Sequence, residues 1–254
     1  MSDETPKSMQ ETFISHLVEL RVRLVRASVV VLAVFIVLFA VWPGAATIYD
    51  WLAQPMMSAL PEGSKMIATG VITPFMVPMK VTMMAAFMLS LPWVLFQVWG
   101  FVAPGLYTHE KKLVAPLVIS SSALFMIGVA FCYFFVFGTV FKFINEFAPK
   151  SISVAPDIEN YLDFVFTMCL AFGLTFEVPV VVVILVRMGL VTVEKLKSIR
   201  PYIIVGAFII AAVVTPPDIM SQLFLAVPLC VLYEVGLLVA PLFQKMTQAP
   251  EEAA

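Results

Sequence analysis

The side chains in this sequence best suited to binding chemistry are glutamates beside or within apolar segments. Glu19 and Glu110 each lie in a short segment with positive charges, next to a long apolar run. A carboxylate there can accept two hydrogen bonds from one arginine guanidinium, and such charge-assisted pairs are strong. If the two segments meet in the fold, their carboxylates suit a ligand that carries two arginines.

Each of these glutamates also has a purely structural interpretation. An apolar stripe at helical spacing is formed by Phe13, Leu17, Leu20 and Leu24. Glu19 lies on the other side of that helix, four residues before Arg23, so the two can form an ion pair within it. Glu110 falls in the first turn of another predicted helix, where Thr108 can cap the helix and a negative charge suits its dipole. The sequence leaves both interpretations open.

Glu177 lies far from either end of an apolar run, which extends back to Asp163 and forward to Arg187. An ionised carboxylate at the centre of a bilayer costs about 2.5–3.5 kcal/mol. We therefore expect either a neutral carboxyl hydrogen-bonded between helices or a polar cavity in front of it. Glu234 and Gln222 interrupt the last apolar run in a similar way, and amides there commonly hydrogen-bond between helices.

Other kinds of site have little support in the sequence. Its two histidines and three cysteines are not spaced as zinc ligands. A phosphate-binding GxxxxGKS or GxxxxGKT loop and a GxSxG nucleophile elbow are both absent from it. The sequence therefore predicts no enzyme, no cofactor and no metal, and an energised process would draw on a partner or on the membrane potential.

The elements that position these residues are predicted to be transmembrane helices. Hydrophobic residues make up 61% of the 254 residues, charged residues only 13%, and the mean hydropathy is +1.01. Soluble domains are about a quarter charged, so much of this surface must face lipid. We expect an all-α fold, a polytopic membrane protein with six transmembrane helices in a single membrane domain over residues 1–254. The expected spans are about 24–42, 76–99, 113–137, 162–186, 202–215 and 219–240.

The two ends of the sequence add two expectations. The first apolar run is not interpreted as a cleavable signal peptide, because its leader is long and acidic at the start. The last two spans are expected to be short. Pro201 can begin the fifth helix, and Pro216 with Pro217 must end it. We favour a short span over a re-entrant hairpin, because Asp218 would be costly in hydrocarbon.

The distribution of positive charge predicts the orientation. With six spans, one side of the membrane receives eleven of the 15 lysines and arginines, and the opposite loops receive three. The basic side is normally cytoplasmic, so both termini are expected to face the cytoplasm.

Four motifs occur in order along the chain: HLVELR at 16–21, FVAPGLY at 101–107 followed by His109 and Glu110, FGLTFEVP at 172–179, and TPPD at 215–218. Together they give the sequence a strong resemblance to the TatC family of the twin-arginine protein translocase. The resemblance extends along nearly the whole chain.

The resemblance implies a cup-shaped signal-peptide receptor in the bacterial cytoplasmic (inner) membrane. Such proteins recognise a consecutive arginine pair and assemble with the single-span subunits TatB and TatA. The complex moves folded proteins and uses the proton motive force. We also expect self-association in the complex, contact with the lipid bilayer and no nucleic-acid partner.

The resemblance also assigns roles to residues at the matching positions. The expected signal-peptide site comprises Glu19, Glu110, Phe101, Arg21 and Leu106. The expected intramembrane polar residues are Glu177, Gln222 and Glu234. The expected outer-face and partner-contact residues are Pro55, Thr215, Pro216 and Asp218.

Three other functions compete with this interpretation. A proton-coupled small-molecule transporter would use Glu177, but it predicts inverted repeats that the sequence does not show. A structural scaffold would leave Glu19 and Glu110 without a ligand. An intramembrane enzyme lacks a plausible nucleophile and base.

Overall fold

The computed structural model describes residues 9–60, 65–102, 114–147, 149, 155–215 and 218–244. All regular elements in these ranges are helical. They are α1 (Met9–Ala40), α2 (Ala45–Ala59), α3 (Thr73–Val102), α4 (Val114–Phe131), the π-helical turn η3 (Cys132–Val136), α5 (Phe137–Phe147), α6 (Ile158–Phe176), α7 (Val178–Arg187), α8 (Val193–Ser198), α9 (Arg200–Val214) and α10 (Ile219–Gln244).

The membrane-spanning units are longer than single helices in two places. α4, η3 and α5 form one apolar rod over Ala115–Phe147, and α6 with α7 forms another over Ile158–Arg187. With His16–Ala40, Thr73–Phe101 and Ile219–Leu242, five described helical units are long and apolar enough to cross a bilayer. α9 is a shorter apolar helix. The predicted all-α, multi-span architecture is therefore confirmed.

The last two helices differ in length, contrary to the expectation that both are short. α9 has 15 residues, which corresponds to roughly 22 Å at the helical rise. α10 has 26 residues, or roughly 39 Å, and continues through Pro228 and Pro241. Glu234 lies within this helix and pairs with Arg200 of α9 at 2.6 Å. Only α9 is short.

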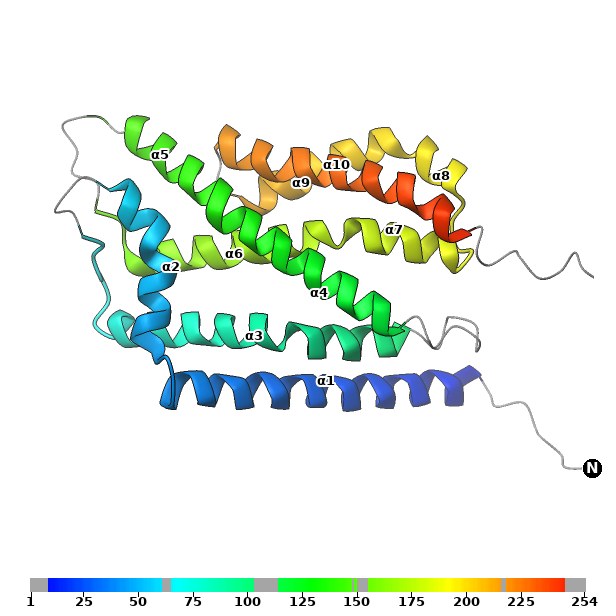
Figure 1. Cartoon of the computed structure of the whole chain (residues 1–254), viewed down its shortest axis with the longest axis horizontal. Coiled ribbons are helices and arrows are strands. Elements are labelled where there is room, and N and C mark those ends of the chain that lie inside the picture. The colour runs from blue at the N-terminus through cyan, green and yellow to red at the C-terminus, as the bar shows by residue number, and fades with distance from the viewer. Residues whose placement is uncertain are drawn as a thin grey trace, which may run out of the picture.

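The helices form a bundle with two distinct ends (Figure 1). The start of α1, the C-terminal end of α3, α8 and the end of α10 lie at one end, and α2 lies across the other (Figure 1). α1 packs on α3, α7 on α10 and α4 on α6. The first and last described helices thus have their outer termini at the same end of the bundle.

The centre of the bundle is a close contact between α4 and α6. A Cβ at Gly128 would lie 2.6 Å from the backbone oxygen of Phe172, and a Cβ at Gly173 would lie 2.4 Å from the ring of Phe125. One glycine from each helix therefore lets the two backbones approach, as small residues do between helices in membranes. The largest buried cluster surrounds this contact and includes Phe137 and Met168.

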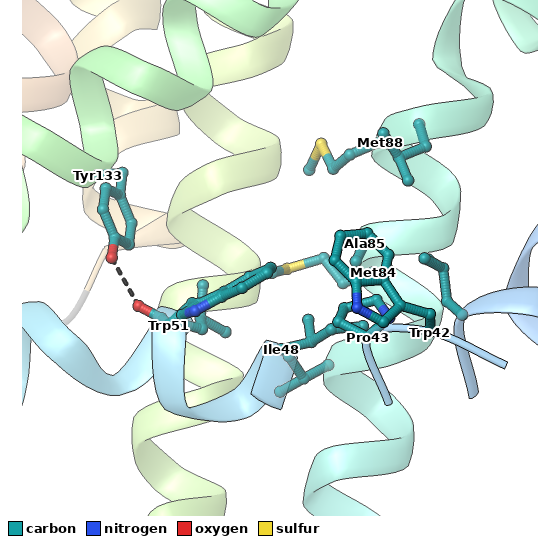
Figure 2. A pocket seen from close by; sticks show the side chains of 12 residues that line it. Trp42, Pro43, Ile48, Trp51, Met84, Ala85, Met88 and Tyr133 are labelled. Carbon is teal, nitrogen blue, oxygen red and sulfur yellow. Dashed lines mark hydrogen bonds between the residues drawn. The ribbon is translucent and has the colours of Figure 1, made fainter. Parts of the chain in front are cut away.

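α2 is attached to the bundle through its own backbone oxygens. Pro55 has no N–H, so the carbonyl of Trp51 loses its partner within the helix. The hydroxyl of Tyr133 in η3 donates to that carbonyl at 2.6 Å (Figure 2). Tyr161 donates to the oxygen of Leu52 at 2.8 Å in the same way. The side-chain amide of Asn145 donates to the oxygen of Ala59 at 3.0 Å. Side chains of the bundle thus donate hydrogen bonds to three backbone carbonyl oxygens of α2.

A second connection at this end joins the segment before α3 to the start of α6. Asp157 caps α6, because its Oδ1 accepts from the backbone N–H of Glu159 and of Asn160. Its Oδ2 accepts from the backbone N–H and the hydroxyl of Thr69. Ile67 and Asp157 also form a parallel backbone bridge. The two segments are therefore held together through one carboxylate.

The α2 attachment predicts a double-mutant effect. Tyr133→Phe removes the donor to Trp51 and should cost about 1 kcal/mol, because the carbonyl loses its bond. In a Pro55→Ala background the new N–H can take over that carbonyl, so Tyr133→Phe should cost less. Thermal unfolding in detergent measures both changes. Equal losses in the two backgrounds would contradict this account of Pro55.

The Asp157 cap predicts a dependence of stability on pH. Hydrogen bonds hold the pKa of the Asp157 carboxyl below its ordinary value of 3.8. The largest effect comes from the Thr69 hydroxyl and the next from the backbone N–H of Asn160. Because the pKa of Asp157 is lower in the folded state than in the unfolded state, the charged carboxylate stabilises the fold at pH values above its ordinary pKa. This stabilisation is lost as the pH falls through the lower pKa of the folded state. The difference in melting temperature between the parent and Asp157→Asn should therefore shrink from pH 5 to pH 3. A melting-temperature difference that stays constant or grows over this pH range would contradict this account of the Asp157 cap.

Candidate functional site

The ends of α1 and α3 form a junction that contains several of the predicted site residues. The ring of His16 in α1 stacks on the ring of Phe101 in α3, with centroids 4.2 Å apart and planes inclined by 22°. Phe101 is one residue from the end of α3. This stacking fixes the position of Phe101 beside the first described turns of α1.

Glu19 lies one helical turn after His16 and pairs with Arg23. The Nε–H of Arg23 donates to Oε1 of Glu19 at 2.8 Å, and its Nη2–H donates to the same oxygen at 2.6 Å. The side chains are 36% exposed for Glu19 and 24% exposed for Arg23. The ion pair that the sequence left open is therefore present. No described residue bonds Oε2, so this carboxylate oxygen has no partner from these parts of the chain.

The guanidinium of Arg23 also rests against α3. A Cβ at Gly100 would lie 2.4 Å from Nη1 of Arg23. Arg23 thus occupies the space that any other residue at position 100 would fill with its Cβ. The last turn of a helix carries partial negative charge on its carbonyls, so a cation is favourable there. Sequence reasoning missed Gly100, because a glycine in an apolar run gives no signal of what approaches it.

The remaining residues of the predicted signal-peptide site are placed only in part. Arg21 is exposed on α1. Glu110 and Leu106 lie outside the described residues, so a meeting of the two carboxylates stays a prediction. The predicted apolar stripe of α1 is not packed against described parts of the protein. Its exposed fractions are 49% for Leu17, 43% for Leu20 and 64% for Leu24.

Glu177 lies where the fourth span breaks. α6 ends at Phe176 and α7 begins at Val178, with Pro179 in its first turn. The side chain is 7% exposed, and neither of its oxygens has a hydrogen-bond partner among the described residues. The hydroxyl of Ser121 lies near the Glu177 carboxyl and accepts from the indole N–H of Trp99 at 3.1 Å, which leaves its own O–H available as a donor. The two interpretations of Glu177, a hydrogen bond between helices or a polar cavity, both stay predictions.

The other predicted polar residues have partners within the protein. Glu234 pairs with Arg200 at 2.6 Å. The Gln222 side chain donates to the oxygen of Phe208 at 3.3 Å, which joins α10 to α9. Asp218 caps α10 by accepting from the N–H of Ser221, and the Thr215 hydroxyl donates to the oxygen of Ala211 at the end of α9. Pro216 lies outside the described residues. Sequence reasoning missed Arg200 as a partner, because the pair joins residues 34 positions apart.

An apolar pocket of about 390 Å³ lies at the opposite end of the bundle, between α1, α2 and α3 (Figure 2). Tyr133 and its bond to Trp51 lie on one side of it (Figure 2). Its lining residues are Leu38, Trp42, Pro43, Ile48, Trp51, Leu52, Val81, Met84, Ala85, Met88, Leu89 and Tyr133. Because this lining contains no carboxylate, amide or cation, the pocket is unsuited to polar chemistry, and it is separate from Glu177.

Comparisons with known proteins identify relatives over nearly the whole chain. The family model described as Sec-independent protein translocase protein (TatC) matches residues 15–228. A Sec-independent protein translocase protein TatC of Haemophilus influenzae is 47% identical over 234 residues, which cover 92% of this chain and 90% of that protein. The protein of the same name in Escherichia coli K12 is 46% identical, over 90% of this chain and 88% of that protein. A crystal structure of a twin-arginine translocase receptor, TatC, matches with a TM-score of 0.78 and 34% identity, over 90% of this chain and 99% of that chain.

The unpartnered burial of Glu177 predicts that its charge does not stabilise the fold. Glu177→Gln removes the cost of ionising a buried carboxyl, so its melting temperature in detergent at pH 8 should equal or exceed that of the parent. Glu159→Gln serves as the contrast. It removes an exposed acid that pairs with Lys80 at 2.9 Å, and it should lower stability by up to about 1 kcal/mol. A clear loss of stability in Glu177→Gln would mean that the carboxylate makes a favourable contact in the fold.

Proposed function

Because this chain belongs to the TatC family, a family of protein translocase components, and is a multi-pass membrane protein, we propose that it is the signal-peptide receptor and core of a translocase. In this proposal the complex moves folded proteins that carry twin-arginine signal peptides across the bacterial cytoplasmic membrane. The proton motive force drives the movement, and the protein itself is not an enzyme and uses no cofactor.

The observation that carries the proposal is the Glu19 carboxylate at the junction of α1 and α3. Its Oε2 has no partner among the described residues, and Phe101 supports the same surface through its stack on His16. A guanidinium can bind this oxygen by a charge-assisted hydrogen bond, and an aromatic ring can line the adjacent peptide. In the proposal Glu110 supplies a second carboxylate, so that two arginines are recognised together. Arg21 and Leu106 complete the site.

The proposed orientation places this junction on the cytoplasmic side. The bias of eleven lysines and arginines against three supports cytoplasmic termini. The outer termini of α1 and α10 lie at one end of the bundle, which is consistent with this orientation (Figure 1). Signal peptides arriving from the cytoplasm would then meet Glu19 directly.

The proposed partners are the single-span subunits TatB and TatA, with further copies of this chain in the complex. The turn between α9 and α10 supports an outer contact, because Asp218 and Thr215 give it a defined shape through their backbone bonds. Pro55 belongs to the same outer end through α2. Site-specific crosslinking from position 222 tests the contact, and an absence of partner adducts would count against it.

The proposal predicts selective loss of peptide binding. A twin-arginine signal peptide should bind the purified full-length protein. Glu19→Ala, Glu110→Ala and replacement of the Arg-Arg pair by Lys-Lys should each weaken binding by about 10- to 150-fold, as lost charge-assisted bonds imply. A titration with fluorescently labelled peptide measures all three.

Glu194→Ala is the matched control, because Glu194 is an exposed acid in α8 at the same end of the bundle (Figure 1). It should bind like the parent. If the Glu19 and Glu110 variants also bind like the parent, these acids do not form the receptor site, and a transporter role centred on Glu177 becomes the next hypothesis to test.

A further inference from the structure

Arg23 is part of the junction but has no role in the function proposed above. Arg23 is a cation beside Glu19, which is proposed to bind the cationic arginines of the signal peptide. On charge alone Arg23 should repel an incoming guanidinium and mask Glu19. Its geometry indicates a different effect, because both of its hydrogen bonds reach the same oxygen of Glu19.

We infer that Arg23 is a positioning residue, which holds the Glu19 carboxylate at the α1–α3 junction with Oε2 turned toward a guanidinium ligand. Two N–H groups on Oε1 fix the carboxylate more firmly than one would. This inference rests on the proposed function, since it requires that Glu19 binds an arginine of the ligand.

The position of Arg23 is in turn set by α3. Its guanidinium is held on one side by Glu19 and on the other by the bare α-carbon of Gly100. Gly100 precedes Phe101, which stacks on His16. The stack and the guanidinium contact therefore come from adjacent residues of α3, and they fix α1 against α3 at two points that lie about two turns apart on α1. The carboxylate between these points has a defined direction.

A fixed carboxylate has a consequence for ligand choice. A guanidinium donates its N–H groups within one plane, so the remaining oxygen, Oε2, must lie in that plane, whereas the three N–H groups of an ammonium can rotate to meet an oxygen in many directions. Arg23 thereby determines specificity: it favours arginine over lysine in the ligand without contacting the ligand itself.

The experiment compares the affinity of the full-length protein for an Arg-Arg signal peptide and for its Lys-Lys form. Arg23→Gln should weaken binding of the Arg-Arg peptide by about fivefold and leave the Lys-Lys peptide nearly unchanged. The ratio of the two affinities therefore falls. Loss of a positive charge would by itself strengthen the binding of both peptides.

Gly100→Ala tests the same geometry with no change of charge. Its Cβ would lie 2.4 Å from Nη1 and must displace the guanidinium, while alanine is favourable in the helix. The same fall in the ratio is expected, and the double variant with Arg23→Gln should lose no more than the larger single effect. Arg26→Gln, which removes an exposed cation one turn further along α1, should leave the ratio unchanged.

The outcomes separate this inference from the proposed function. If Arg23→Gln binds the Arg-Arg peptide more tightly, Arg23 competes with the ligand, and the inference is wrong. A second outcome is that Arg23→Gln and Gly100→Ala both keep the parental ratio of Arg-Arg to Lys-Lys affinity while Glu19→Ala loses binding. In that case Arg23 only stabilises the helix, and Glu19 remains part of the receptor site. If Glu19→Ala also binds normally, the proposed site itself fails. Melting temperatures of all variants identify any that do not fold.

Discussion

Most of this structure follows from the need to satisfy backbone polar groups where water is scarce. Only helices can cross a bilayer with all their backbone hydrogen bonds internal, and every described span is helical. Proline breaks that pattern by removing a donor, and three of the described helices, α2, α3 and α10, contain proline in their interior. At Pro55 a tyrosine hydroxyl from another element replaces the missing donor. A local backbone defect thus becomes a tertiary contact.

The same constraint governs the charges. Arg23 with Glu19, Arg200 with Glu234, and Lys80 with Glu159 each neutralise an acid near an end of the bundle. A pair of this kind lowers the cost of placing charge close to hydrocarbon. Glu177 is the exception among the described acids inside the spans, since it is buried and has no hydrogen-bond partner there. Its location between α6 and α7 places this polar group at a break in the backbone of the span.

The sequence was sufficient to predict the class of fold, because an apolar run of about 20 residues has few alternatives to a spanning helix. It also predicted the possible pair of Glu19 and Arg23, since their spacing is local. It could not predict contacts between distant segments, such as Tyr133 with Trp51 or Arg200 with Glu234. It also described the last span as short, although the expected range of 219–240 already passed Glu234, and α10 extends to Gln244. Gly100 shows the same limit, since its importance depends on the arginine that rests on it.

The contact between α4 and α6 has a mechanical consequence. With Gly128 and Gly173 each facing the partner helix at close range, these helices have no room to slide past one another, and they form a rigid body. α1 is different, because it contacts mainly α3 and exposes most of its length. Because α1 is held mainly by α3, α1 is the helix that can tilt on ligand binding while the contact between α4 and α6 stays fixed.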